Sequence, residues 1–307
     1  MSNLGRALKR LKQPILKTLG GLGYEVRKIR SDPNVGLYVS LYSGPSIHER
    51  RFYNIGAGGF SHPCWTNVDM VSDWYARNRR QTLKGIQFDM LSLLPLPMET
   101  ASAEAVYSSH TVEHVNDEAA QNMFNEVHRV LKPGGYFRVT APNVNQGFEA
   151  WRRNDRRFFY WSDTYSIPEK WRAIQLNGPM NDASIAQLFL YQFASSVSVL
   201  HADGAERRIE DAELDRLFRT MSREDALNFI CAQCPLEIQR RYPGNHINWW
   251  SPDKILAMLG KAGFSVAYPS AYGQSICPAM RDTAYFDNTH PAISFYFEAL
   301  AEREDGR

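Results

Sequence analysis

Three glycines directly follow a short apolar stretch, and their spacing suits the binding of a nucleotide. Arg51–Ile55 predicts a strand, Gly56-Ala57-Gly58-Gly59 follows it at once, and a second predicted strand, Trp65–Val68, ends on Asp69. Glycines after a strand allow a tight turn and let backbone N–H groups approach a ligand closely. A carboxylate at the tip of the next strand can accept hydrogen bonds from ribose hydroxyls. The pattern indicates a nucleotide-containing cofactor at the carboxyl edge of a parallel sheet.

Two other interpretations of these glycines compete with this one. A glycine loop without any ligand is common, so the turn alone is a weak signal. A dinucleotide-binding oxidoreductase would need a glycine at the sixth position of the motif, where Ser61 stands. Such an enzyme would also place its acidic residue about 20 residues further on, whereas Asp69 follows Gly56 by only 13. The oxidoreductase interpretation is therefore disfavoured.

Histidines offer a second kind of chemistry, the removal of a proton from an acceptor group. His110 follows a predicted strand, and His246 follows a long segment of different composition. Histidine is the side chain that most often acts as a general base, so both are candidate catalytic residues. We interpret Glu113 and His114 as capping and packing residues, because they lie in the turn that opens a predicted helix. We interpret His290 as a structural loop residue.

Cysteine pairs can bind zinc, and Cys231-Ala-Gln-Cys234 has a suitable spacing. No second pair follows, since Cys64 and Cys277 stand alone. The apolar neighbours of the pair favour a buried helical turn. We therefore expect no metal site. Four cysteines are too few for a disulfide framework and suit a reducing compartment.

The composition is that of an ordinary globular protein. The chain has 307 residues, of which 44% are hydrophobic and 22% charged, and its net charge is +2. This balance argues against nucleic acid as a partner. No run of 18 apolar residues predicts a membrane-spanning helix, and the N-terminus does not resemble a secretion signal. We expect a cytoplasmic protein whose oligomeric state the sequence leaves open.

Positive charge is concentrated in residues 1–30, which contain eight Lys/Arg and one Glu. Their apolar residues recur at helical spacing, and Pro14 divides the segment. A basic amphipathic helix can lie on an anionic membrane surface, which would place residues 1–20 at the inner face of the membrane. The alternative is a helix that packs on the domain, and we favour it because the segment is short and broken.

The rest of the chain alternates strands with helices. A connector with a strand at Leu37–Tyr42 comes first, and Asn116 is the predicted N-cap of a helix that Pro133-Gly134-Gly135 ends. Ser251 caps a helix that runs to Leu259. The remaining predicted strands are Ile86–Phe88, Ala105–Ser108, Tyr136–Thr140, Phe264–Tyr268 and Ile293–Glu298. Alternation of this kind predicts an α/β fold with a doubly wound, mostly parallel sheet.

Residues 146–245 interrupt this alternation. They begin with a stretch rich in aromatic residues and arginine, from Trp151 to Trp161, and continue with predicted helices near 185–200 and 209–234. We interpret the segment as a helical insertion that covers the site and binds the substrate. The α/β domain then consists of residues 31–145 and 246–307.

Four motifs occur in an order that a known family shares. They are Asn54-Ile55-Gly56-Ala57-Gly58-Gly59, then Asp69, then Asp89 with Leu94-Pro95-Leu96-Pro97, and finally Ser108–His114 with Val130–Gly135. In this set the chain resembles class I S-adenosylmethionine-dependent methyltransferases of the type 11 kind, over about residues 50–142 and more loosely over 246–300. The resemblance implies a seven-stranded, Rossmann-like methyltransferase fold and S-adenosylmethionine as cofactor.

The resemblance also implies roles for single residues. The usual acid before the glycines is Asn54 here, and His110 would line the methyl-transfer site, with His246 as a second catalytic candidate. The residues expected to bind the cofactor are Asn54, Gly56, Gly58, Asp69, Asp89, Met90 and Ser109.

A finer resemblance concerns the acceptor. The short segment between Gly59 and Trp65, and His246-Ile247-Asn248-Trp249-Trp250 near the end, are similar to methyltransferases associated with bacterial surface polysaccharides. This similarity implies O-methylation of a sugar or a carrier-linked glycan. Two alternatives stay open: a methyltransferase acting on a secondary metabolite, and a non-catalytic module that binds S-adenosylmethionine and serves in assembly.

Overall fold

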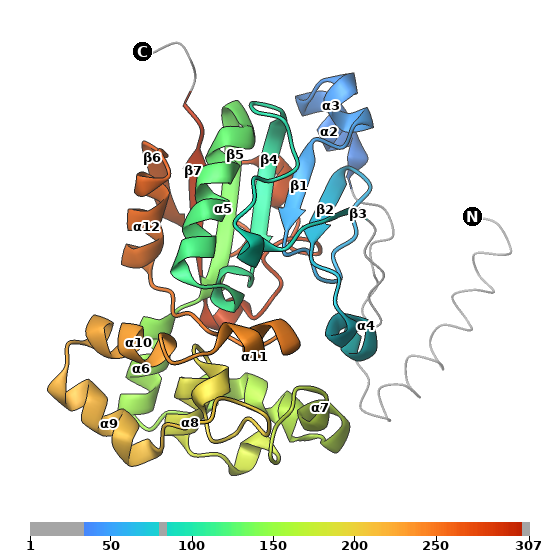
Figure 1. Ribbon diagram of the computed structural model, residues 1–307. Coiled ribbons are helices and arrows are strands. Elements are labelled where there is room, and N and C mark those ends of the chain that lie inside the picture. The colour runs from blue at the N-terminus through green and yellow to red at the C-terminus, as the bar shows by residue number, and fades with distance from the viewer. Residues whose placement is uncertain (1–33, 80–84, 303–307) are drawn as a thin grey trace, which may run out of the picture. The chain divides into compact units, whose positions relative to one another are not determined.

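A seven-stranded sheet forms the centre of the chain from Val35 onward (Figure 1). The structure is a computed structural model that describes residues 34–79 and 85–302. The predicted basic segment, residues 1–30, lies outside the described residues. The sheet has the order β3-β2-β1-β4-β5-β7-β6.

The sheet is parallel except at one strand. Strands β1 to β5 pair in parallel, and β7 is antiparallel to both of its neighbours, β5 and β6. The α/β fold with a mostly parallel, seven-stranded sheet is therefore confirmed. The strands are β1 (Phe52–Ile55), β2 (Trp65–Asp69), β3 (Gly85–Gln87), β4 (Ala103–Ser109), β5 (Leu131–Pro142), β6 (Val266–Ser270) and β7 (Ser294–Leu300).

The pairing register aligns the carboxyl ends of β1, β2 and β4 at one edge of the sheet. Ile55 of β1 pairs with Val68 of β2 on one side and with Ser108 of β4 on the other. Because these strands are parallel, the residues that follow them emerge at the same edge. The glycine turn, Asp69 and His110 therefore leave the sheet side by side.

One face of the sheet is covered by α5 (Asp117–Val130) and α12 (Pro252–Lys261), which contact each other. Both begin as predicted, because Asn116 accepts a hydrogen bond from the Ala119 N–H at 3.0 Å and Ser251 accepts one from Lys254 at 3.2 Å. Their apolar sides join a buried cluster that includes Phe124. Burial of a side chain of that size contributes about 1.5–3 kcal/mol.

The predicted strand at Leu37–Tyr42 is wrong. These residues belong mainly to helix α2 (Val35–Leu41), which is followed by α3 (Gly44–His48). Tyr38 and Tyr42 are four residues apart, so both rings reach Phe52, with centroids 5.2 and 4.7 Å from its ring. Packing on the opposite face of the sheet thus selects a helix, which local propensity did not indicate.

Two other boundaries differ slightly from the prediction. Helix α5 ends at Val130, and Pro133-Gly134-Gly135 lies in an irregular part of β5, where the pairing shifts from Ala103 with Leu131 to Ala105 with Tyr136. Strand β6 begins at Val266, two residues after its predicted start.

Residues 143–245 form a helical region at the carboxyl edge of the sheet, since β5 leads into α6 and the chain returns just before α12 (Figure 1). The long helices predicted there are shorter and broken. The helices are α6 (Val144–Arg152), α7 (Pro168–Ala173), α8 (Ile185–Tyr191), α9 (Asp211–Thr220), α10 (Arg223–Cys231) and α11 (Leu236–Arg241), and a 3-10 turn spans Arg156–Ser166.

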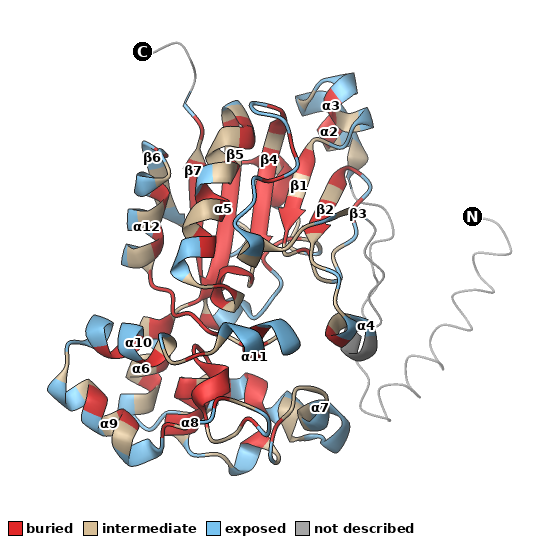
Figure 2. Cartoon of the chain, in the orientation of Figure 1, coloured by how far each residue is buried: buried red, intermediate tan, exposed pale blue. Residues whose placement is uncertain are grey.

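The helical region has a core of its own. Figure 2 shows buried residues in the strands of the sheet and, separately, around α8. Phe189 and Phe193 of this second core are almost fully buried, with ring centroids 5.1 Å apart. Among the residues that the structure describes, no helix is both long and apolar enough to cross a membrane.

Candidate functional site

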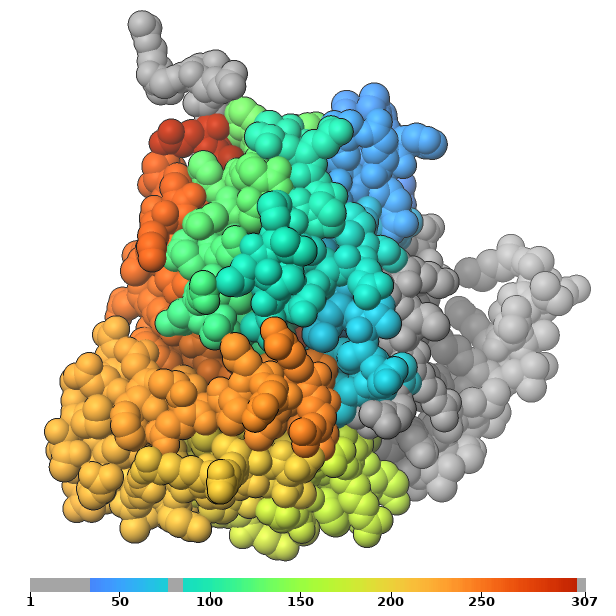
Figure 3. Space-filling model, in the orientation of Figure 1, coloured from blue at the N-terminus to red at the C-terminus, as the bar shows by residue number. Residues whose placement is uncertain are grey.

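A cavity of about 610 Å³ lies between the carboxyl edge of the sheet and the helical region. The space-filling view shows the helical region, yellow to orange, directly against the sheet region, green and cyan (Figure 3). All nine residues predicted for the site line this cavity: Asn54, Gly56, Gly58, Asp69, Asp89, Met90, Ser109, His110 and His246. Their placement together is observed, and their individual roles remain predictions.

The glycine turn after β1 depends on glycine at two positions. Gly56 and Gly58 have φ angles of +68° and +54°, in the left-handed region that favours glycine. A Cβ atom on Gly56 would also overlap the side chain of Thr111. The Gly56 N–H donates to Val68 O at 2.8 Å, which ties the turn to β2. Glycine therefore brings the backbone of β1 against the turn after β4.

Two aspartates, one at the end of β2 and one just after β3, hold the adjoining turns. Asp69 accepts hydrogen bonds from the N–H groups of Gly58 and Met70, both at 2.7 Å. Asp89 caps the 3-10 turn Met90–Ser92 and accepts from Leu91 N–H at 2.9 Å. Both carboxylates thus organise backbone on the cavity wall where a cofactor would lie.

Asn54 stands where the family usually has an acid. Its side chain is 3% exposed, lines the cavity, and its Oδ1 atom has no hydrogen-bond partner among the described residues. An unpaired buried carbonyl oxygen costs about 1–3 kcal/mol. A ligand that donates a hydrogen bond at this position would remove that cost.

His110 lines the same cavity, just after β4. Its φ angle is +51°, and its N–H donates to Thr140 O at 2.9 Å. The ring lies between two partners: Nδ1 is 3.1 Å from Glu113 Oε1, and Nε2 is 2.7 Å from Ser294 Oγ. A histidine held by a carboxylate on one nitrogen is oriented to exchange a proton on the other.

Glu113 has a buried carboxylate that lies close to three histidines, His110, His114 and His246. It is 1% exposed, and its Oε2 atom has no hydrogen-bond partner among the described residues. Burial alone would raise its pKa, but the hydrogen bond with His110 and the nearby rings of His114 and His246 hold the pKa at about 2. Glu113 therefore stays ionised at neutral pH.

Two further histidines are held in one orientation by backbone carbonyls. His246 Nδ1 is 2.6 Å from Gln192 O, and His114 Nδ1 is 2.8 Å from Asn245 O. A carbonyl oxygen only accepts hydrogen bonds, so each Nδ1 carries a proton. Burial lowers the pKa of His246.

The sequence interpretation missed part of this site. Glu113 and His114 are interpreted from the sequence as capping and packing residues; Glu113 is buried, the side chain that caps α5 is Asn116, and both Glu113 and His114 also line the cavity. His290 also lines the cavity, where its Nδ1 is 3.2 Å from the hydroxyl of Tyr160. No local pattern linked these histidines, because the segments that carry them are far apart in the sequence.

Aromatic side chains form another part of the wall. They come from helix α4 (Asp73–Arg79), from the helical region and from the loop before β7: Trp74, Tyr75, Trp161, Tyr165, Tyr191 and Tyr285. Arg240 is the one lysine or arginine among the described lining residues. Aromatic faces with a few polar groups are typical of a site for an organic ligand.

Sequence comparison identifies a family for the central part of the chain. Residues 63–139 match the family model described as a methyltransferase domain. No functionally curated protein matches the chain in sequence.

Solved structures give distant likenesses. A possible histamine N-methyltransferase from Thermotoga maritima is 13% identical with a TM-score of 0.37, covering 87% of this chain and 86% of its own. A methyltransferase from Mesorhizobium loti is 13% identical with a TM-score of 0.35, covering 83% and 96%. The CMeT domain of the citrinin polyketide synthase is 10% identical with a TM-score of 0.34, covering 82% of this chain and 46% of its own, so the chain spans about half of that structure. Scores this low support no conclusion about the acceptor.

Proposed function

This chain carries an S-adenosylmethionine-dependent methyltransferase domain, and from this premise we propose that the protein O-methylates a sugar or a carrier-linked glycan. The observation that carries the proposal is a single cavity with two unlike walls. One wall has the glycine turn and the two aspartates, and the other has the His110–Glu113 pair. A cofactor and an acceptor can therefore meet in one enclosed space.

The first wall fits the cofactor in two respects. Gly56 packs against Thr111 at a positive φ angle, whereas open space surrounds Gly59, so the backbone of the turn is open to a ligand there. The unpaired Oδ1 atom of Asn54 offers an acceptor for an amino group. We assign Asp69 to the ribose and Asp89, with Met90, to the adenine. When bound, S-adenosylmethionine supplies an activated methyl group, so the protein has mainly to align the acceptor and exclude water.

The second wall supplies a base for a hydroxyl acceptor. With Nδ1–H donating to Glu113 Oε1, the lone pair of His110 Nε2 can take the proton of the acceptor hydroxyl. That nitrogen lies 2.7 Å from the hydroxyl of Ser294, which itself donates to the His290 carbonyl oxygen at 2.8 Å, so an acceptor hydroxyl would take the place of Ser294 beside Nε2. The Glu113 carboxylate stabilises the imidazolium that results.

The aromatic wall suits a sugar. Tyr165 and Tyr191 offer apolar rings with polar tips, a combination that contacts both the ring face and the hydroxyls of a sugar. The exposed guanidinium of Arg240 could pair with the phosphate of a carrier. The same residues would methylate the hydroxyl of a secondary metabolite. The glycan proposal and this alternative therefore differ only in the acceptor.

The test is methyl transfer from S-adenosylmethionine to a panel of sugar nucleotides, lipid-linked glycans and small phenolic hydroxyls, with S-adenosylhomocysteine formation as the readout. We expect turnover with a glycan and at least ~10²-fold less turnover with His110→Asn. Turnover with the phenols alone would favour a secondary metabolite. Cofactor binding without turnover on any acceptor would favour a non-catalytic module.

A further inference from the structure

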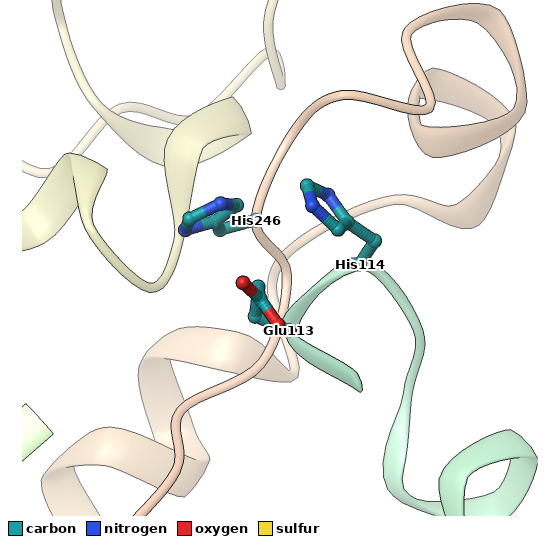
Figure 4. Close-up of side chains that lie close together, drawn as sticks. All are labelled: Glu113, His114 and His246. Atoms are coloured by element: carbon teal, nitrogen blue, oxygen red, sulfur yellow. The ribbon is translucent and has the colours of Figure 1, made fainter. Parts of the chain in front are cut away.

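Three side chains converge in the cavity, and neither the family match nor the sequence motifs assign them a joint role. Glu113 and His114 follow β4, and His246 comes from the chain that returns from the helical region (Figure 4). Their ligand atoms, one carboxylate oxygen and two ring nitrogens, lie within 4.8 Å of one another. We propose that Glu113, His114 and His246 bind a divalent transition-metal ion of the zinc class.

The orientation of the two histidines supports the proposal. Backbone carbonyls of Asn245 and Gln192 accept hydrogen bonds from the Nδ1–H groups, so Nε2 is the nitrogen by which each ring would bind a metal. Metal-ligating histidines in proteins almost always donate their other N–H to a carbonyl or carboxylate in this way. The Asn245 carbonyl is itself fixed, because Gln239 Nε2 donates to it at 3.0 Å.

The burial of Glu113 supports it independently. The side chain is 1% exposed, and its Oε2 atom has no hydrogen-bond partner among the described residues. A buried polar oxygen without a partner is destabilising. His110 compensates one oxygen, Oε1. A cation bound at Oε2 would compensate the other.

The donor set selects the kind of ion. Two imidazole nitrogens and one carboxylate suit Zn²⁺ and neighbouring transition metals, whereas Mg²⁺ and Ca²⁺ prefer oxygen ligands. Bonds of about 2.0–2.2 Å to a tetrahedral ion place its ligand atoms roughly 3.4 Å apart, so binding would draw these three side chains together by an ångström or so. Three protein ligands leave a coordination position open.

The open coordination position would let the ion bind the acceptor of the reaction, a role that rests on the function proposed above. A hydroxyl bound to the metal loses its proton more readily, since the ion stabilises the alkoxide. That proton would pass to His110 Nε2. The site therefore favours an acceptor that presents a hydroxyl, and its neighbouring hydroxyl in a sugar could also contact the ion.

The first experiment uses the metal alone. The purified protein, freed of metal with a chelator, is titrated with Zn²⁺ by calorimetry and with Co²⁺ by visible absorption. We expect one equivalent to bind and Glu113→Gln and His246→Asn each to weaken binding by at least ~10²-fold, since removal of a ligand costs more than removal of its orienting partner.

Matched controls are His48→Gln, an exposed histidine elsewhere, and Cys234→Ser, which removes a thiol of the other zinc-like motif. Both should bind the ion as the unaltered protein does. Variants are compared after each shows unaltered affinity for S-adenosylhomocysteine. If Glu113→Gln does not fold, His114→Gln gives the same test.

Two outcomes would overturn the proposal: no stoichiometric binding, or binding that persists in the Glu113 and His246 variants. Either would leave methyl transfer itself untouched. Conversely, a bound ion together with no methylation of any hydroxyl acceptor would contradict the proposed function and leave the metal site standing. If a chelator abolished turnover and Zn²⁺ restored it, the metal site would be shown to take part in methyl transfer.

Discussion

The two walls of the cavity differ in how their residues are distributed along the chain. The cofactor wall is built from Asn54 to Met90, where the residues lie at or just after the ends of three adjacent strands, β1, β2 and β3. The other wall joins His110, Glu113 and His114 to His246 and to Ser294. The first wall is a property of consecutive turns and the second a property of the tertiary fold, so changes in each should have separable effects.

The largest effect is expected on the second wall. His110→Asn should lower kcat about 10²–10⁴-fold, because it removes the proposed base, while the Kd for S-adenosylhomocysteine changes less than about threefold, below 1 kcal/mol. Steady-state kinetics and calorimetry measure the two. His48→Gln, on an exposed side chain, is the control and should alter neither. A parallel rise in Kd would mean that the two walls are not separable.

A change at the junction of the walls should destabilise the protein. Gly56→Ala places a Cβ against Thr111 at a positive φ angle. We expect a loss of about 2–5 kcal/mol in the free energy of unfolding, from backbone strain and overpacking together. Urea unfolding measures it. Gly178→Ala, which has open space around it, should change stability by less than about 0.5 kcal/mol, and an equal loss there would remove the steric argument.

A change on the first wall should affect cofactor affinity. Asp69→Asn weakens the hydrogen bonds from Gly58 and Met70 and removes the charge proposed to contact the ribose. Hydrogen bonds to charged groups contribute about 1.5–3 kcal/mol, so the Kd for S-adenosylmethionine should rise roughly 10–100-fold. The kcat at saturating cofactor should fall far less. Unaltered affinity would show that Asp69 only shapes the turn.

The smallest expected effect is a change of stability with pH, caused by one buried histidine beside the sheet and one in the core of the helical region. His62, beside the sheet, and His201, in the helical region, have pKa values lowered to about 4 by burial. His201 Nδ1 accepts from Asp203 N–H at 3.2 Å, which a proton on that nitrogen would break. Because the folded pKa lies below the unfolded value of about 6.5, stability is complete above pH 6.5 and is lost as the pH falls toward 4.

Between pH 7 and 5 each of these histidines should reduce the free energy of unfolding by about 1–2 kcal/mol. Chemical unfolding at several pH values measures this slope. His201→Gln should flatten it, whereas His48→Gln should not. One common transition for both cores would show that the sheet and the helical region unfold together, and two transitions would show that they unfold separately.

The comparison also explains where sequence reasoning succeeded. Glycines, an acid at a strand tip and the caps Asn116 and Ser251 act on residues within a few positions, so their spacing is visible in the sequence. Leu37–Tyr42 was assigned wrongly because apolar residues over six positions fit a strand or a helix. The packing of Tyr38 on Phe52 decided between them.

The sequence by itself determined the alternation of strands and helices, the glycine turn and the family resemblance, because these depend on local backbone preferences and on consecutive motifs. Only the tertiary structure decided that Glu113, His114 and His246 share one site. Gln192 and Asn245 hold the two histidines through backbone carbonyls, and a backbone carbonyl carries no sequence signal. Its position depends on how the helical region packs against the sheet.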